Sequence, residues 1–389
     1  MDPRAVAVRA TRIAPMPYFD HAATTPMRDC ARQAWAEYSG LLNPGGQYGS
    51  GRRAAAVLAE AREEVAELLG ADPVEVVFTG SGTEADNLAV RGLYRASRGG
   101  RVVASPIEHP AVLETVKSLA VTEGARLEWL PVTREGRVED FSLLDAPAGV
   151  ATLMWANNET GVVQPVAEAA ARAAVVGTPF HVDAVQAVGK VPVDFHELGA
   201  TTLAASAHKF GGPRGTGILL ARRSPAPTAV ITGGGQERGL RSGTVDVASA
   251  AATAAALREA VGEMAHEEAR LIRLGEALVA GILREVPDAR VTTPLPALPG
   301  HVHVLFPGAN GDALIMLLDS LGLEASTGSA CAAGVNRSSH VLEAMGVAPE
   351  AAAGALRLTL GRTSTEKDVE ELVGEIGGVV TRARIAGSL

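Results

Sequence analysis

Short apolar runs alternate with stretches of helical spacing through much of the chain, and this alternation restricts the fold more than any other feature. Apolar runs that predict buried strands occupy residues 74–78, 102–104, 150–155, 179–183, 202–205 and 216–221. Helical patterns lie between several of them, for example up to residue 98 and at 166–176. Strands that alternate with helices pair in parallel. The chain is therefore predicted to be an α/β protein with a mainly parallel, doubly wound sheet.

A change of pattern near residue 245 predicts a second domain. A long helical region covers residues 245–283 and ends before Pro287. A strand at 301–306, a helix at 311–321, a strand at 355–360 and a last helix from about residue 365 follow it. A length of 389 residues suits two domains. We expect a large domain of residues 18–260 and a smaller α+β C-terminal domain of residues 261–389, joined by the N-terminal residues 1–17.

Charge and cysteine content exclude several classes of protein. The net charge of −9 argues against a nucleic-acid partner, and no apolar run is long enough to span a membrane. Residues 1–17 lack the apolar core of a secretion signal, so we expect a cytoplasmic protein. Cys30 and Cys331 are the only two cysteines, which excludes a disulfide framework and argues against a metal site. Either cysteine could still be a catalytic thiol.

A lysine stands at the end of one predicted strand. Lys209 lies between His208 and a glycine-rich turn at residues 211–217, just after the apolar run 202–205. Open α/β sheets bind their ligands at this end of the strands. A lysine that is removed from water there can lose its proton and become an amine nucleophile. The alternative is a solvated lysine before a loop.

Other predicted strands also end in polar or glycine-rich turns. Thr79-Gly80-Ser81-Gly82-Thr83 joins a strand to a helix, and free N–H groups and the helix dipole make such a turn an anion site. A small-residue turn also simply caps a helix. His109 follows the next strand; a lone histidine is more often structural than catalytic. The glycine-rich loop at residues 43–51 could approach a ligand closely, or it is an ordinary connector. The glycine-rich loop at residues 233–244 could contact an anion or another subunit.

Two further strands end in groups that could bind a polar ligand. Asn157 and Asn158 follow one strand, and consecutive amides are better placed to bind a ligand than to pack in a core. Asp183 ends the next strand, with Gln186 just beyond it. A carboxylate in this position can pair with a protonated ring nitrogen, as pyridoxal phosphate enzymes require.

The predicted C-terminal domain contributes a thiol and a guanidinium. Small residues surround Cys331 in the stretch 326–334, which is typical of an exposed cysteine and not of a packed one. Arg357 alternates with Leu356 and Leu358, so it faces away from the core and could hold a carboxylate. A surface salt bridge is the alternative for Arg357.

Taken together, these motifs resemble the cysteine desulfurases, pyridoxal-phosphate enzymes of the class V aminotransferase group. The resemblance runs from Asp20 to about Arg362, and its motifs come in the family's order. They occupy residues 20–26, 78–87, 108–109, 156–159, 181–186, 206–217, 233–244 and 328–331. The resemblance implies a fold type I homodimer with active sites at the subunit interface.

The resemblance also implies a role for each matched residue. Lys209 would hold pyridoxal 5′-phosphate covalently and later move the substrate Cα proton. His109 would stack on the ring, Asp183 would pair with its nitrogen, and Gln186 would bond to its phenolic oxygen. Gly82, Thr83, Ser206 and His208 would also bind the cofactor, the last three at its phosphate, and Thr244 would reach in from the partner subunit. Asn158 and Arg357 would bind the substrate carboxylate.

The reaction that the resemblance implies converts L-cysteine to L-alanine. Sulfur would remain on Cys331 as a persulfide and pass to an acceptor protein in iron–sulfur cluster assembly, tRNA thiolation or a biosynthetic pathway. The cysteine segment, with residues 335–339 before the next helix, resembles the longer-loop subgroup of the family, which usually serves iron–sulfur assembly or tRNA thiolation. Two stretches depart from the family pattern: residues 45–48 replace a common Ser-Ser-x-His, and residues 332–334 lack the frequent hydroxyl groups.

Other functions are compatible with parts of the pattern. A selenocysteine lyase, a C–S lyase or an epimerase could use the same scaffold, and Cys331 favours desulfuration because the last two need no thiol. A scaffold without activity that binds a sulfur carrier is a further alternative. The presence of Lys209, Asp183 and Cys331 together argues against it.

Overall fold

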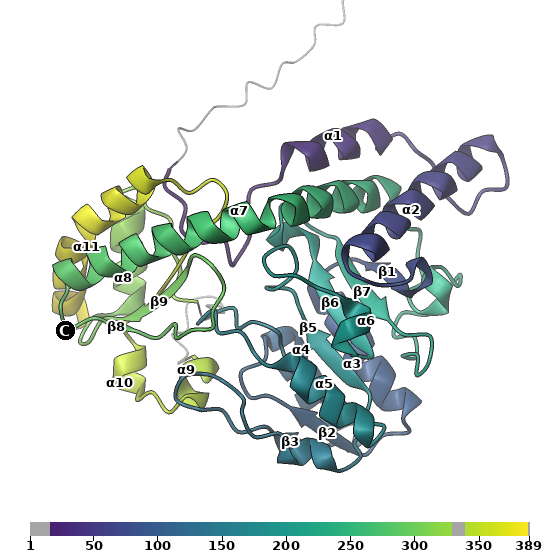
Figure 1. The fold of residues 1–389 in the computed structure, drawn as a ribbon, viewed down its shortest axis with the longest axis horizontal. Coiled ribbons are helices and arrows are strands. Elements are labelled where there is room, and N and C mark those ends of the chain that lie inside the picture. The colour runs from purple at the N-terminus through teal and green to yellow at the C-terminus, as the bar shows by residue number, and fades with distance from the viewer. Residues whose placement is uncertain (1–15, 329–338, 388–389) are drawn as a thin grey trace, which may run out of the picture.

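The computed structural model describes residues 16–328 and 339–387 and contains a large, twisted, seven-stranded sheet (Figure 1). The strands lie in the order β1-β7-β6-β5-β4-β2-β3. Only β7 runs antiparallel to its neighbours, β1 and β6. The predicted α/β fold with a mainly parallel sheet is therefore confirmed. The strands are β1 (Val76–Thr79), β2 (Arg101–Ala104), β3 (Arg126–Trp129), β4 (Val150–Thr152), β5 (Phe180–Asp183), β6 (Thr202–Ser206) and β7 (Gly217–Ala221).

Helices cover both faces of this sheet. Alternate strand residues point to opposite faces, so Ile218 and Leu220 of β7 pack in the cluster that includes α2, α5 and α7. Leu219, between them, packs with α3 on the other face, where α4 also lies. The helices of this part are α1 (Asp29–Tyr38), α2 (Gly49–Leu68), α3 (Gly82–Ala96), α4 (Pro110–Glu123), α5 (Val166–Val175) and α6 (Phe195–Leu198).

One strand is shorter than its apolar run. The sequence predicts a strand over residues 150–155, but β4 ends at Thr152. Beyond it, the backbone N–H of Met154 donates to the side chain of Glu108 (3.1 Å), which is buried under the loop after β2. A side-chain acceptor thus replaces the sheet partner on the β2 side, while the N–H groups of Leu153 and Trp155 still donate to the backbone of His181 (3.2 Å) and Asp183 (2.8 Å) on the β5 side.

A second, smaller sheet carries its own hydrophobic core. Its three antiparallel strands lie in the order β10-β9-β8, and Leu356 and Leu358 pack against α11 and the C-terminal half of α7. The elements are β8 (Arg290–Val291), β9 (His301–Leu305), α8 (Gly311–Ser320), α9 (His340–Ala344), α10 (Pro349–Ala352), β10 (Ala355–Thr359) and α11 (Glu366–Gly387). No helix within the described residues is long and apolar enough to cross a membrane.

The long helix α7 (Val247–Glu285) connects the two cores. Its first half, up to Ala260, packs against the large sheet, and its residues from Leu274 onward pack in the smaller cluster (Figure 1). We propose that the clusters mark two domains, residues 18–260 and 261–389. The short stretch around Phe19 reaches across, since Phe19 packs in the smaller cluster and Asp20 pairs with Thr359 of β10.

Candidate active site

A cavity of about 840 Å³ opens at the carboxyl ends of the parallel strands, the edge at which open α/β sheets bind ligands. Side chains that follow β1, β2, β4, β5 and β6 line it, together with Asp20 and the β10 residue Arg357. The cavity brings together ten residues that the sequence singled out: Gly82, Thr83, His109, Asn158, Asp183, Gln186, Ser206, His208, Lys209 and Arg357.

Lys209 ends the 3-10 turn η3 (Ala207–Lys209), directly after β6. Its Nζ donates to the carbonyl oxygens of Ala22 (2.6 Å) and Ala23 (2.8 Å), so the amine is held inside the cavity and not in open solvent. Burial, helped by the positive charge of Arg357, lowers the pKa of Lys209 to about 8. The amine therefore loses its proton near pH 8, well below an ordinary lysine, and its neutral form can act as a nucleophile or base.

Asp183 lies at the end of β5, buried next to a second carboxyl group. Its Oδ1 accepts from the N–H of Val185 (2.9 Å). Burial, together with the charge of Asp86, raises the pKa of Asp183 to about 7. Asp86, on α3, lies 3.1 Å from Nε2 of His181, whose Nδ1 is 2.9 Å from Oγ1 of Thr202. A cation bound against Asp183 would favour its ionised form.

His109 is the N-cap of α4 and presents its ring to the cavity. Its Nδ1 accepts from the N–H of Ala111 (3.1 Å), so the ring proton sits on Nε2. Burial, then the charge of Lys209, lowers the pKa of His109 to about 4. A ring that stays neutral at physiological pH can stack on an aromatic ligand without burying a charge.

The start of α3 has the form of an anion site. Ser81 caps the helix by accepting from the N–H of Glu84 (3.0 Å), and the first helical N–H groups have no partner inside the helix. A Cβ on Gly82 would lie only 2.8 Å from Cγ2 of Val185 and 3.1 Å from Cβ of Ser206. Glycine is therefore required for this close approach, and the turn, Ser206 and His208 together fit a phosphate group.

Arg357 is buried, and one of its N–H donors has no partner among the described residues. Its Nη2 pairs with Asp20 (2.6 Å) and its Nη1 donates to the carbonyl oxygen of Asn158 (2.7 Å). Its Nε is buried and, among the described residues, has no hydrogen-bond partner. Only 4% of the surface of Arg357 is exposed to solvent, so the alternative interpretation as a surface salt bridge is wrong. An unpaired buried donor beside Asn158 fits a carboxylate ligand.

Of the predicted site residues that the structure describes, Thr244 does not line this cavity. Thr244 is exposed on the loop 233–244. Arg241 of the same loop forms an ion pair with Glu84 at the start of α3 (2.8 Å). Cys331 lies outside the described residues. The other cysteine, Cys30, does not readily ionise to a thiolate, because burial and then its hydrogen bond with Glu259 raise its pKa to about 11.

Three residues of this region had no predicted role: Asp20 and Asp86, which lie within matched motifs, and Lys190. Asp86 lies one helical turn after Gly82, on the same face of α3, and this spacing could have identified it. Lys190 lies four residues beyond Gln186 and donates to its side chain (2.9 Å). Nothing local marks Asp20 as the partner of an arginine more than 300 positions away.

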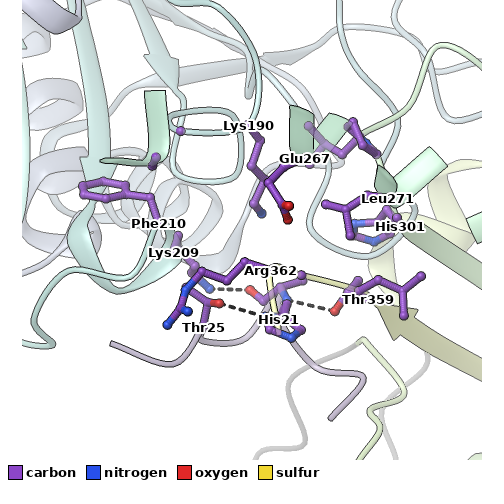
Figure 2. Close-up of a pocket in the computed structure, with 18 of the residues that line it drawn as sticks. His21, Thr25, Lys190, Lys209, Phe210, Glu267, Leu271, His301, Thr359 and Arg362 are labelled. Atoms are coloured by element: carbon purple, nitrogen blue, oxygen red, sulfur yellow. Dashed lines mark hydrogen bonds between the residues drawn. The ribbon is translucent and has the colours of Figure 1, made fainter. Parts of the chain in front are cut away.

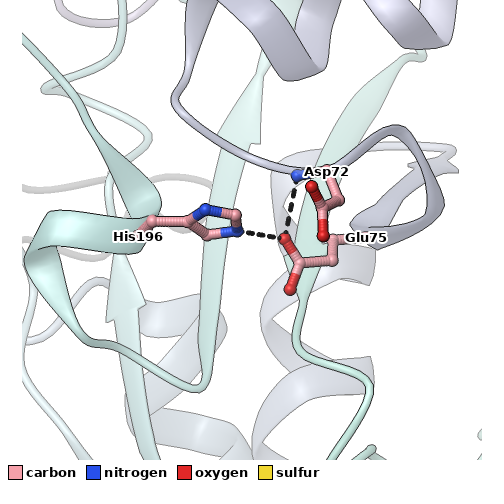
Figure 3. A group of neighbouring side chains, drawn as sticks. All are labelled: Asp72, Glu75 and His196. Atoms are coloured by element: carbon pink, nitrogen blue, oxygen red, sulfur yellow. Dashed lines mark hydrogen bonds and ion pairs between the residues drawn. The ribbon is translucent and has the colours of Figure 1, made fainter.

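A second cluster of titratable side chains, Asp72, Glu75 and His196, lies away from the cavity (Figure 3). Glu75 accepts from the N–H of Asp72 (3.0 Å) and lies 2.7 Å from Nε2 of His196. The first contact is half of the capping box of the 3-10 turn η1 (Pro73–Glu75). Local structure thus explains the cluster.

The raised pKa of Asp183 predicts a pH-dependent stability in the cofactor-free protein. A folded pKa of about 7, raised from 3.8, means that this carboxyl stabilises the fold below pH 3.8 and that the contribution is lost as pH rises through 7. Asparagine keeps the acceptor for Val185 and does not titrate. Asp183→Asn should therefore gain about 3 kcal/mol relative to the parent between about pH 5 and pH 8. Urea unfolding at the two pH values measures this, and equal pH dependence of both proteins would contradict it.

The chain matches a protein family and several known proteins over most of its length. Residues 17–372 match the family described as "Aminotransferase class-V". The chain is 46% identical over 385 residues to the "IscS-like cysteine desulfurase" of Mycobacterium tuberculosis, which covers 95% of this chain and 98% of that protein. A solved "NIFS-LIKE PROTEIN" superposes with a TM-score of 0.88 at 34% identity, over 95% of this chain and all of the other. The structure "SspA in complex with cysteine" gives a TM-score of 0.76 at 29% identity, over 90% of this chain and 99% of the other.

Proposed function

This chain belongs to the class V aminotransferases and is a pyridoxal-phosphate-dependent cysteine desulfurase, and we propose that the 840 Å³ cavity around Lys209 is its active site. The observation that carries this proposal is the convergence of ten separately predicted residues on that one cavity. They come from five strand ends of the large sheet and from β10 of the smaller one.

The residues present suit the cofactor. We propose that Gly82, Thr83, Ser206 and His208 bind its phosphate end, where the close approach at Gly82 leaves room for backbone donors. His109 would stack on the ring, Asp183 would pair with the ring nitrogen, and Gln186 would bond to the phenolic oxygen. Bound pyridoxal phosphate withdraws electrons from the substrate Cα and so makes its proton acidic.

The protein's own groups then have separate tasks. Arg357 and the amide of Asn158 would bind the substrate carboxylate and so orient Cα toward Lys209, which lines the same cavity. Lys209, with a pKa near 8, can accept the Cα proton close to neutral pH. Asp20 already pairs with Arg357, so substrate carboxylate would compete with that ion pair for the guanidinium.

We propose that Cys331 carries the sulfur. Its thiolate attacks the substrate sulfur and forms an S–S bond, while the Cβ–S bond of L-cysteine breaks and its electron pair goes to the carbon side. Two protons restore the methyl group and Cα, so that L-cysteine and the Cys331 thiol become L-alanine and a Cys331 persulfide. The raised pKa of Cys30 supports Cys331 as the thiol that reacts.

The wider setting is also a proposal. We propose a homodimer in which Thr244 completes the partner subunit's phosphate site, since Thr244 does not line its own cavity. The persulfide would pass to an acceptor protein, in iron–sulfur cluster assembly, tRNA thiolation or a biosynthetic pathway. A low cysteine content fits a cytoplasmic location.

An assay with L-cysteine tests the proposed function. Protein loaded with pyridoxal phosphate should form alanine from L-cysteine, and added thiol should release the sulfur as sulfide. Pyruvate, ammonia and sulfide in place of alanine would favour a C–S lyase. Conversion of L-cysteine into its mirror image, with no loss of sulfur, would favour an epimerase. Selenocysteine supplied in parallel distinguishes a selenocysteine lyase.

Arg357→Lys should weaken substrate binding without loss of cofactor. The planar guanidinium of Arg357 contacts Asp20 and the carbonyl of Asn158 and would also bind the substrate carboxylate. Lysine keeps the positive charge but cannot make all three contacts with its single amine. The loss of a charged hydrogen bond, about 2 kcal/mol, predicts a KM for L-cysteine roughly 30-fold higher. Steady-state kinetics measure it, with Arg384→Lys as the control because that arginine pairs with Asp288 near the surface. An unchanged KM would contradict the role of Arg357.

A further inference from the structure

We propose that Lys190 is a positioning residue that fixes the orientation of the Gln186 amide, and thereby determines which atom of Gln186 faces the cofactor. The proposal rests on the proposed role of Gln186 as the donor to the phenolic oxygen of the cofactor. It adds a residue outside the proposed cofactor cavity, because Lys190 lines a second cavity that shares Ala22 and Lys209 with the first.

The contacts form a short chain of hydrogen bonds. Nζ of Lys190 donates to Oε1 of Gln186 (2.9 Å), and Nε2 of Gln186 donates to the carbonyl oxygen of Ala22 (2.8 Å). The same carbonyl accepts from Nζ of Lys209 (2.6 Å). Lys190 is thus connected to Lys209 through one amide and one backbone oxygen.

The chemistry of the two ends leaves the amide a single orientation. The charged form of Lys190, which prevails below about pH 7, has only donors, and a backbone carbonyl is only an acceptor. The oxygen of Gln186 must therefore face Lys190, and its nitrogen must face Ala22. A flipped amide would place N–H against N–H and oxygen against oxygen at the two ends. Gln186 is 4% exposed, so water cannot easily replace either partner.

The setting of Lys190 supports a role beyond packing. Within the described part of the chain, the only hydrogen-bond partner of its amine is Gln186, and no carboxylate forms an ion pair with it. Figure 2 shows Lys190 and Lys209 lining one small cavity, of about 90 Å³, with His21 and Arg362. Burial, then the charge of Lys209, lowers the pKa of Lys190 to about 7. A buried amine without a carboxylate partner destabilises the fold, which favours a functional reason for its position.

The consequence concerns the remaining hydrogen of the Gln186 amide. With the oxygen turned toward Lys190, both amide hydrogens lie on the other side, and one of them is bonded to Ala22. The second is left for an acceptor in the cofactor cavity, which Gln186 also lines. Without Lys190 only the carbonyl of Ala22 still favours this orientation, so the flipped amide becomes more populated. The flipped amide presents its oxygen to the same acceptor, and two oxygens repel.

Single and double substitutions test this chain. In Lys190→Met, the apoprotein should bind pyridoxal phosphate about tenfold more weakly, and the absorbance maximum of the bound cofactor should move. Lys190→Arg, which still offers only donors, should retain the parental maximum. Lys367→Met makes the same change at an exposed lysine on α11 and should leave both readings unchanged. If Lys190→Met does not fold, Lys190→Gln serves, because its amide can accept as well as donate and should move the maximum too.

The decisive comparison uses Gln186→Ala. If Lys190 acts through Gln186, Lys190→Met should change affinity by less than about twofold in the Gln186→Ala background. An additional tenfold loss there, or a parental maximum in Lys190→Met, would overturn the proposal. A parental maximum and affinity in Gln186→Ala itself would instead contradict the proposed role of Gln186. The two failures are therefore distinguishable.

Discussion

Replacing Lys209 with alanine is expected to slow alanine formation from L-cysteine by about 1,000-fold or more, because this one amine both holds the cofactor and moves a proton. The structure places Nζ inside the cavity, on the carbonyl oxygens of Ala22 and Ala23, with a pKa near 8. Among the ten predicted residues that line the cavity, Lys209 is the only lysine. Of the predicted residues there, only Lys209 can therefore supply the amine.

Reduction with borohydride measures the covalent role of Lys209 separately from the rate. In the parent, the reagent should fix the cofactor irreversibly to a peptide that contains Lys209. Lys209→Ala should lose the fixed cofactor, and Lys367→Ala, at an exposed site on α11, should keep it. A cofactor still fixed to the Lys209→Ala protein would place the covalent bond elsewhere.

Cys331→Ser is expected to separate cofactor binding from sulfur transfer. The variant keeps every described residue of the cavity, so it should bind pyridoxal phosphate with the parental absorbance. It should form no persulfide from L-cysteine, because a hydroxyl at this position is neither ionised nor nucleophilic enough near neutral pH. Persulfide is measured by release of sulfide with added thiol.

Cys30→Ser is the matched control for that variant. Cys30 is partly buried on α1 and donates to the carbonyl oxygen of Ala255 (3.5 Å), and burial raises its pKa to about 11. Its replacement should leave persulfide formation at the parental rate. Release of alanine and sulfide at the parental rate by Cys331→Ser would show that the thiol role is wrong.

Most of the large sheet could be predicted because its signals are local. Buried parallel strands are short, continuous apolar runs, and Phe180–Asp183 and Thr202–Ser206 begin or end within a residue or two of the predicted positions. The contact of β4 with Glu108 could not be predicted, because no local pattern shows that this side chain takes the place of a strand beside Met154. Likewise, no local pattern shows that Phe19 packs in the core of the smaller sheet.

The candidate site divides in the same way. Lys209, Asp183 and His109 stand at strand ends, where topology alone brings them to one edge of the sheet. Lys190 and Asp20 act through contacts with other side chains, and such pairs have no fixed spacing in the sequence. The sequence therefore indicates which groups face a ligand more readily than which groups orient them.

The location of the sulfur after one turnover tests the central claim most directly. Cofactor-loaded protein is mixed with L-cysteine in the absence of free thiol, the alanine is counted, and the peptides are weighed by mass spectrometry. We predict one alanine for each added sulfur atom, with that sulfur on the peptide that contains Cys331. Alanine formed with Cys331 unmodified, or with the sulfur on Cys30, would contradict the account.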